Sequence, residues 1–108
     1  MNRKTFFEYL CGNTTVLIVF ITGNNCAFCD AITPYVELKK GACHFPCLHI
    51  DREKDADVYS LLMAKKQIKG VPSLLAYSSG NCSVYANVSI SGINKNEINE
   101  FFDGLDFL

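Results

Sequence analysis

The sequence contains no tryptophan, only three prolines among 108 residues, and no long hydrophobic run. Its longest apolar run extends from Val16 to Ile21, whereas a helix that crosses a membrane needs about 20 apolar residues. The first residues are not followed by the apolar core of a secretory signal peptide. The formal net charge is −1, and the lysines are scattered rather than gathered into a basic stripe. We therefore expect a cytoplasmic protein that binds neither membranes nor nucleic acid.

The composition is that of a chain with a packed core. Hydrophobic residues make up 49% of the sequence and aromatic residues 12%, which argues against a disordered segment. The length matches the commonest size of one domain, and no repeat or linker divides it. We expect residues 1–108 to form a single domain.

Six cysteines in so short a chain raise the alternative of a secreted domain held together by disulfides. Three Asn-x-Ser/Thr sequences, at Asn13, Asn81 and Asn87, point weakly the same way. A disulfide framework usually replaces a hydrophobic core, however, and this chain has the residues to build one. Four of the cysteines are therefore expected to be reduced, buried thiols, with a regulatory or dimer-forming disulfide as the alternative. These four are Cys11, Cys43, Cys47 and Cys82.

The periodicity of the apolar residues predicts alternating helices and strands. The predicted helices cover residues 4–11, 26–40, about 55–67 and a last segment that starts at Asn94. The predicted strands cover 15–21, 46–51, 73–77 and 82–90, the last two joined by a short turn at 78–81. Strands that alternate with helices pair in parallel, and the terminal hairpin adds antiparallel strands. The sequence thus predicts an α/β fold with a central mixed four-stranded sheet flanked by helices.

The helix predicted over 26–40 has two features of its own. Phe28, Ile32 and Val36 are expected to fall on one stripe of this helix, with Phe28 exposed at the helix start, and Gly41 is expected to end the helix. Pro34 lies inside this helix, where it removes a backbone donor, so we expect a kink there.

A pair of cysteines, Cys26 and Cys29 in the sequence Cys-Ala-Phe-Cys, begins this helix shortly after the apolar strand. A helix N-terminus carries about half a positive charge and presents unpaired backbone N–H groups. Both features stabilise a thiolate, and thiols in such motifs can have a pKa of about 7 or below instead of about 8.5. The second cysteine, one helical turn later, is placed to close a disulfide with the first. The motif therefore predicts a redox site with Cys26 and Cys29 as its catalytic residues.

A structural zinc site is the alternative interpretation of this pair. Cys43 and Cys47, with two histidines nearby, would supply the remaining ligands. The residues between the two pairs are predicted to be helical, and about 14 residues at 1.5 Å each place the pairs roughly 20 Å apart. Zinc–sulfur bonds of about 2.3 Å cannot bridge that distance. We therefore expect no metal and no other cofactor, and we interpret His44 and His49 as polar residues near a strand.

The sequence resembles the thioredoxin family at several positions that occur in the family's order. The apolar strand with Phe20 precedes the cysteine pair, and Pro34 follows where thioredoxins have a helix-kinking proline. Ile50 and Asp51 match the end of the family's next strand. The remaining matches are Gly70-Val71-Pro72-Ser73-Leu74-Leu75, similar to the family's Gly-Ile-Pro-Thr segment, and Ser91-Gly92 before the last helix. The resemblance covers nearly the whole chain and implies a thioredoxin fold with a kinked active-site helix.

The resemblance also implies a dithiol–disulfide oxidoreductase that reduces protein disulfides. Cys26 would attack a substrate disulfide, and Cys29 would resolve the mixed disulfide. The Val71–Pro72 bond would be cis and would present the Val71 backbone to an extended substrate strand. The implied substrate-binding residues are Val71, Pro72, Phe28, Asn25 and Gly92. An upstream thioredoxin reductase or a glutathione system would supply electrons, and we expect a monomer.

Several positions depart from the thioredoxin pattern. Asn25 replaces the tryptophan that usually precedes the first cysteine, and the turn contains one extra residue. The buried acid under the active site is expected one residue before Phe20, where this chain has Val19. Its usual lysine partner on the neighbouring strand is replaced by Cys47. The internal acid–base pair for the resolving thiol is therefore expected to be absent, and resolution is expected to be slow.

Two other functions remain as alternatives. A redox-inactive, thioredoxin-like binding module would hold a partner along the Val71–Pro72 edge. The missing acid and tryptophan favour this function, whereas the intact cysteine pair argues against it. A glutathione-linked, glutaredoxin-like enzyme receives slight support from the aromatic Phe28 before the second cysteine.

Overall fold

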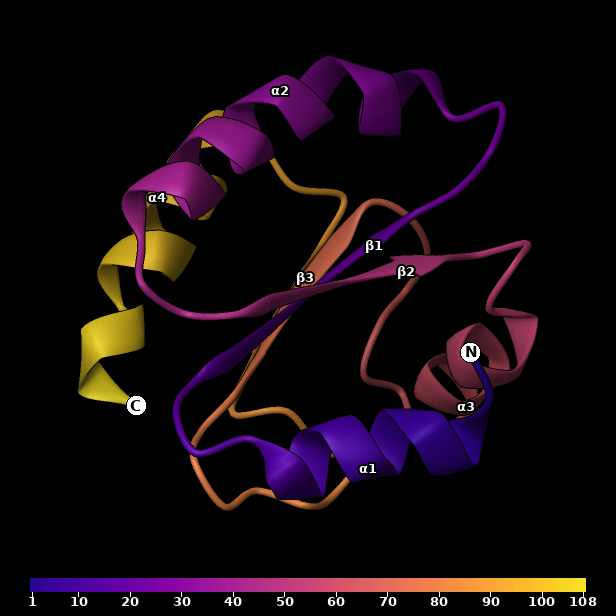
Figure 1. Ribbon diagram of the computed structural model, residues 1–108. Coiled ribbons are helices and arrows are strands. Elements are labelled where there is room, and N and C mark those ends of the chain that lie inside the picture. The colour runs from indigo at the N-terminus through magenta and orange to yellow at the C-terminus, as the bar shows by residue number, and fades with distance from the viewer.

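A four-stranded sheet runs through the centre of the computed structural model, which describes residues 1–108 (Figure 1). Its strands are β1 (Leu17–Thr22), β2 (Cys47–Asp51), β3 (Ser73–Tyr77) and β4 (Val88–Ser91). They lie in the order β2-β1-β3-β4, and β1 pairs in parallel with β2. The β1–β3 and β3–β4 pairs are antiparallel. The mixed four-stranded sheet expected from the sequence is confirmed.

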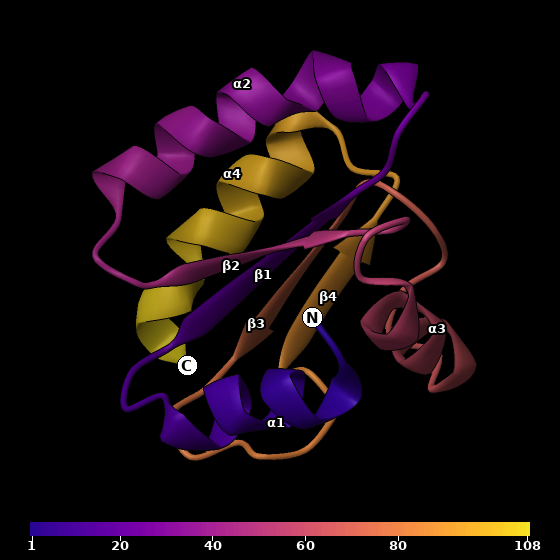
Figure 2. The ribbon, with the colours of Figure 1, turned by 45° about the vertical axis from the view of Figure 1, so that its right-hand side comes forward.

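Helices cover both faces of this sheet (Figures 1 and 2). They are α1 (Arg3–Gly12), α2 (Ala27–Ala42), α3 (Ala56–Ala64) and α4 (Lys95–Asp103), followed by a 3-10 turn, η1 (Leu105–Phe107). One face carries α1 and α3, and the other carries α2 and α4. None of these helices has the length and apolar character needed to span a membrane.

β1 divides the hydrophobic core into two layers. Because side chains alternate along a strand, Leu17, Val19 and Ile21 pack in the cluster under α1 and α3. Ile18 and Phe20 pack in the cluster under α2 and α4. A strand buried on both faces needs an unbroken apolar run, which explains the strong strand signal in the sequence. The cysteine pair follows at the C-terminal end of this central strand.

The boundaries of two helices differ from the predicted ones. Cys26 is the N-cap of α2 rather than its first helical residue, and the helix continues through Gly41 to Ala42. Gly41 therefore does not end the helix, because an exposed glycine lowers helical stability without blocking a backbone hydrogen bond. α3 ends at Ala64, before the predicted end, and Lys66 follows with a left-handed φ of 58°.

α2 buries Cys29, Ile32 and Val36, whereas Phe28 is 51% exposed. The expected exposure of Phe28 is confirmed, although the residues three and four positions before Ile32 both lie near its face. The smaller side chain of Cys29 takes the inner place and the aromatic ring stays outside. Pro34 lies inside α2, and the helix curves over the sheet in Figure 1.

The strand predicted over 82–90 is shorter, and residues 78–87 form an irregular connection that we call the 78–87 loop. Asn81 organises it, because its Nδ2 donates to the carbonyl of Tyr85 at 2.9 Å and to Oδ1 of Asn87 at 2.8 Å. Val84 is buried, and its carbonyl accepts a hydrogen bond from the Tyr77 hydroxyl at 2.7 Å. Side-chain bonds of this kind compete with a strand ladder. The apolar alternation that indicates a strand here instead anchors a loop.

Candidate active site

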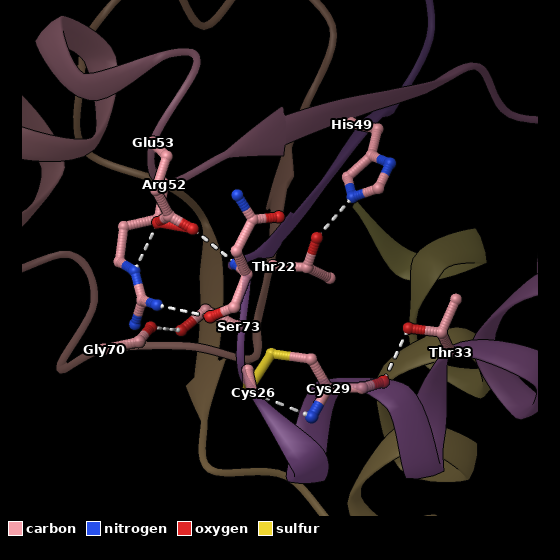
Figure 3. Close-up of a disulfide and its surroundings, with 10 residues drawn as sticks. Thr22, Cys26, Cys29, Thr33, His49, Arg52, Glu53, Gly70 and Ser73 are labelled. Atoms are coloured by element: carbon pink, nitrogen blue, oxygen red, sulfur yellow. Dashed lines mark hydrogen bonds and ion pairs between the residues drawn. A yellow bond between two sulfur atoms is a disulfide. The ribbon is translucent and has the colours of Figure 1, made fainter.

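Cys26 occupies the N-cap of α2, the position whose side chain can pair with the free amides of the first helical turn. Its Sγ accepts a hydrogen bond from the backbone N–H of Cys29 at 3.1 Å (Figure 3). The positive end of the helix dipole lies at the same point. A thiolate gains more from both interactions than a neutral thiol does. The local structure at the N-cap therefore favours a thiolate at Cys26 in the reduced pair.

Cys26 and Cys29 are joined by a disulfide, with their Cα atoms 5.2 Å apart. This separation is within the range of about 4.4–6.8 Å that a disulfide can bridge, so the oxidised state fits the helix start without distorting it. Cys29 is only 2% exposed, whereas Cys26 is partly exposed. The sulfur that an external disulfide can reach is therefore that of Cys26.

Charged side chains of the β2–α3 connection hold the turn before Cys26 (Figure 3). Arg52 Nη2 donates to the Asn24 carbonyl at 2.9 Å, and the Glu53 carboxylate accepts from the Asn24 backbone N–H. Arg52 Nε and Glu53 pair with each other at 2.6 Å, and this hydrogen bond lowers the pKa of the Glu53 carboxyl. Asn25 has a φ of 51°, a left-handed conformation that asparagine adopts more readily than most residues. This clamp fixes the turn that leads into Cys26.

The implied substrate-binding residues Val71 and Pro72 come just before β3, and Gly92 follows β4. Val71 and Gly92 help to line a cavity of about 290 Å³. The Val71–Pro72 peptide bond is cis, and Pro72 is buried. The Pro72 carbonyl accepts a hydrogen bond from the Gly92 N–H at 3.0 Å. Gly92 has a φ of 62°, which favours glycine at this position.

Ser73 holds this edge from inside the protein. It is fully buried, and its Oγ donates to the Gly70 carbonyl at 2.6 Å (Figure 3). The same Oγ lies 2.7 Å from Ser91 Oγ. By contrast, neither the N–H nor the C=O of Val71 makes a hydrogen bond within the chain. An anchored loop with one free peptide edge can pair with an extended chain.

The sheet residue beneath α2 is Phe20 and not Val19. Phe20 packs with Ile32 of α2, whereas Val19 packs with Phe6 of α1 and Val58 of α3. The expectation that Val19 takes the place of the buried acid under the active site is therefore wrong. A displacement of one residue along a strand moves a side chain to the opposite face, so an error of one position assigned the acid's place to the wrong face of the sheet.

His49 is the functional candidate that the sequence did not reveal. It pairs with Phe20 across β1 and β2, and its ring stacks on the Phe20 ring with centroids 5.4 Å apart. Its Nε2 lies 2.7 Å from the Thr22 hydroxyl (Figure 3). Because Phe20 and Thr22 belong to the face that α2 covers, the imidazole lies on the same side of the sheet as Cys29. Only the pairing of β1 with β2 reveals this, and no short motif encodes it.

The other titratable groups on this face are poor acceptors for the proton of a thiol. Burial raises the pKa of the Cys47 thiol to about 11. Hydrogen bonds from the backbone N–H groups of Lys54 and Glu53, each 2.9 Å long, lower the pKa of the Asp51 carboxyl. Histidine is the side chain that ordinarily exchanges protons near neutral pH. His49 is therefore the candidate base on this face.

Phe28 and Asn25, the remaining implied substrate-binding residues, are exposed on either side of Cys26 in the sequence. No cluster of three or more His, Cys, Asp or Glu side chains is arranged to hold a metal ion.

The expectation of four buried cysteines is wrong for Cys11 and Cys82, which are both exposed. Cys11 lies outside the buried stripe of α1, and Cys82 belongs to a loop rather than to the predicted strand.

Neither a protein-family model nor a curated protein matches the sequence. Solved structures match it along nearly its whole length. Thioredoxin O1 from Arabidopsis thaliana, in its oxidised state, has a TM-score of 0.70 at 18% identity and covers 96% of this chain and 92% of its own. Thioredoxin f2 from Chlamydomonas reinhardtii has a TM-score of 0.72 at 18% identity, and the match covers 95% of this chain and 91% of thioredoxin f2. A mutant thioredoxin from Halobacterium salinarum has a TM-score of 0.72 at 17% identity, and the match covers 99% of this chain and 86% of the mutant thioredoxin. The chain has the thioredoxin fold.

The thioredoxin fold explains why distant parts of this sequence meet at one end of the sheet. β1 and β3 are antiparallel, so the end of β1 lies beside the start of β3, where Ile21 pairs with Ser73. Ser73 in turn pairs with Ser91 of β4. The cysteine pair after β1, the Val71–Pro72 bond before β3 and Gly92 after β4 therefore gather at this end. At the identities found, the likeness establishes the fold, and the chemistry has to be argued from the site.

Proposed function

We propose that this chain is a thiol–disulfide oxidoreductase that reduces protein disulfides through Cys26 and Cys29. The observation that carries the proposal is the N-cap position of Cys26, with Cys29 buried one turn later and already bonded to it. A helix start that stabilises a thiolate, next to a second sulfur at bonding distance, supports reversible exchange. The free Val71 backbone at the same end of the sheet supports binding of an extended substrate.

The reaction proceeds in two exchanges. The Cys26 thiolate attacks one sulfur of the substrate disulfide, forms a mixed disulfide and releases the first substrate thiolate. Cys29 then loses its proton to His49, directly or through one water molecule, and attacks the Cys26 sulfur. This step closes the Cys26–Cys29 disulfide and releases the second substrate thiolate, which takes up a proton from the solvent. The substrate gains two electrons, and the enzyme loses two.

The proposed substrate is an extended segment of a protein that carries a disulfide. Its backbone pairs with the free N–H and C=O of Val71, and exposed Phe28 and Asn25 contact its flanking residues. A thioredoxin reductase or the glutathione system is the proposed source of electrons, and the reducing cytoplasm is the proposed location. The proposed oligomeric state is a monomer.

The test is to trap the intermediate. We expect Cys29→Ser to accumulate mixed disulfides, because the resolving sulfur is missing, and peptide mapping should place them on Cys26. We expect Cys26→Ser to abolish reduction of insulin, a protein with accessible interchain disulfides. Cys43→Ser, at the far end of α2, is the control that should reduce insulin normally.

Partners trapped on Cys29 or Cys43 would contradict the assigned roles. If the natural chain bound protein partners but reduced no disulfide, the redox-inactive binding module would replace this proposal. If it reduced only glutathione mixed disulfides, the glutaredoxin-like function would replace it.

A further inference from the structure

Two exposed cysteines outside the active site come together at the surface. Cys11 lies in the last turn of α1, and Cys82 lies in the 78–87 loop. In both Figure 1 and Figure 2 the orange segment after β3 runs along α1. The 78–87 loop and α1 are thus neighbours, and the nearby Cys82 thiol raises the pKa of the Cys11 thiol, which places the two side chains close together.

Packing beneath the two thiols holds their backbones in place. Leu10, the neighbour of Cys11, is 2% exposed and shares a hydrophobic cluster with Val84 of the loop. Tyr77 joins the two segments, because its ring packs edge-on against Phe6 of α1 at 6.2 Å. Its hydroxyl donates to the Val84 carbonyl. The loop is therefore docked on α1 by buried contacts, independently of the cysteines.

The backbone on either side of Cys82 is also fixed. The Asn81 N–H donates to the Ser78 carbonyl at 3.1 Å, and Asn81 Oδ1 accepts from the Ser83 N–H at 3.0 Å. A disulfide forms readily only where two Cα atoms are held less than about 7 Å apart with suitable side-chain directions. Two neighbouring thiols on anchored backbones satisfy this requirement better than two thiols on mobile segments.

We propose that Cys11 and Cys82 form a second redox pair, a surface disulfide that closes reversibly and ties α1 to the 78–87 loop. The pair acts separately from Cys26 and Cys29, because Cys11 precedes β1 and Cys26 follows it. β1 has 6 residues, which corresponds to about 20 Å at 3.3 Å per residue. The two pairs therefore lie at opposite ends of the sheet, and the oxidant of the second pair comes from outside the molecule.

A small disulfide such as oxidised glutathione is the proposed oxidant. Cys82 attacks one glutathione sulfur as a thiolate, forms a mixed disulfide and releases one glutathione thiolate. Cys11 then gives up its proton and attacks the Cys82 sulfur, which releases the second glutathione thiolate. The two protons lost by the cysteines end on the two glutathione thiols. The protein loses two electrons, and the glutathione disulfide gains them.

The experiment uses the full chain with Cys26→Ser and Cys29→Ser, so that the active-site pair cannot contribute. The reduced protein is equilibrated with oxidised glutathione, alkylated, digested with trypsin and mapped by mass spectrometry. Trypsin places Cys11 in peptide 5–39 and Cys82 in peptide 70–95. We expect these two peptides to be linked within one molecule, with a mass two hydrogens below the sum. Adding Cys11→Ser should abolish the link and leave glutathione on Cys82, whereas adding Cys43→Ser should leave the link unchanged.

A second readout tests the consequence of the link. Because a cross-link limits the freedom of the unfolded chain, oxidation should raise the midpoint of thermal unfolding by several degrees. Dithiothreitol should reverse the rise, and the Cys11→Ser protein should show none. The proposal is overturned if Cys11 and Cys82 remain separately alkylated or glutathionylated, if they link only between molecules, or if the midpoint does not move. None of these outcomes bears on the reduction of insulin by Cys26.

Discussion

Single residues at the floor of the active site decide how the resolving thiol can lose its proton. Phe20 faces α2 and Cys29, and His49 stacks on Phe20 from the neighbouring strand. A phenylalanine ring accepts no proton, so we propose that the imidazole beside it takes the role of the missing carboxylate. Thr22 bonds to Nε2 of His49 and fixes the orientation of the ring.

Replacement of His49 should therefore slow resolution. We expect His49→Asn to reduce the decay rate of the mixed disulfide at Cys26 by about a hundredfold near pH 7, the low end of general-base contributions. The rate in this variant should rise with pH, because water must then accept the proton. Stopped-flow measurement of mixed-disulfide decay across pH tests this.

His44→Asn is the matched control, because His44 lies beyond the C-terminal end of α2 and should be neutral. Val19→Asp offers a second contrast. Its carboxyl would enter the core under α1 and α3, so it should destabilise the protein without accelerating resolution. Equal decay rates in the natural chain and His49→Asn would remove His49 from the mechanism.

At the scale of elements, the reactive end of α2 depends on a turn that another connection holds. The Asn24 peptide is bonded on both sides, through its carbonyl to Arg52 and through its N–H to Glu53. Arg52 also fills the space above Gly23, where a Cβ atom would lie 2.7 Å from the guanidinium carbon. The N-cap geometry of Cys26 is thus supported by residues between β2 and α3.

Removal of this clamp should loosen the turn more than it weakens the fold. In Glu53→Ala we expect hydrogen exchange at Asn24 and Asn25 to become about tenfold faster, which corresponds to about 1.4 kcal/mol of local opening. Global stability should change by less than about 1 kcal/mol, because exposed ion pairs contribute little. Exchange measured by mass spectrometry on peptides that cover the turn is the test.

The neighbouring substitution Lys54→Ala is the control, since the Lys54 side chain makes no ion pair or hydrogen bond. Unchanged exchange at Asn24 in Glu53→Ala would show that the turn is held by other contacts.

At the scale of the whole molecule, two buried acids on opposite faces of the sheet make the fold sensitive to alkali. Burial raises the pKa of the Cys47 thiol from 9.0 to about 11. Burial also raises the pKa of the Tyr77 hydroxyl above its ordinary 10.0. In both cases the folded state favours the protonated form, whereas the unfolded chain ionises at the ordinary pKa. Their contribution to stability is therefore complete below about pH 9 and is lost as the pH rises further.

We accordingly expect the urea midpoint of the natural chain to be level up to about pH 8.5 and to fall between about pH 9 and 11. Cys47→Ala should make the first part of this fall shallower. Tyr77→Phe should make the later part shallower, although loss of its hydrogen bond to Val84 costs about 1 kcal/mol at neutral pH. A midpoint that stays level to pH 11 would contradict the raised pKa values.

The sequence by itself determined the order of the elements, the mixed sheet and the cysteine pair at the start of α2. These follow from local rules: β1 must be apolar throughout to be buried on both faces, and a helix start after a strand is readable from a few adjacent residues. The tertiary structure decided which face each β1 residue presents, that His49 meets Phe20, and that Cys11 meets Cys82. It also decided that Arg52 and Glu53 hold the turn before Cys26. Those relations depend on strand register and loop docking between segments far apart in the chain, and a displacement of one residue reverses the face of every side chain in a strand.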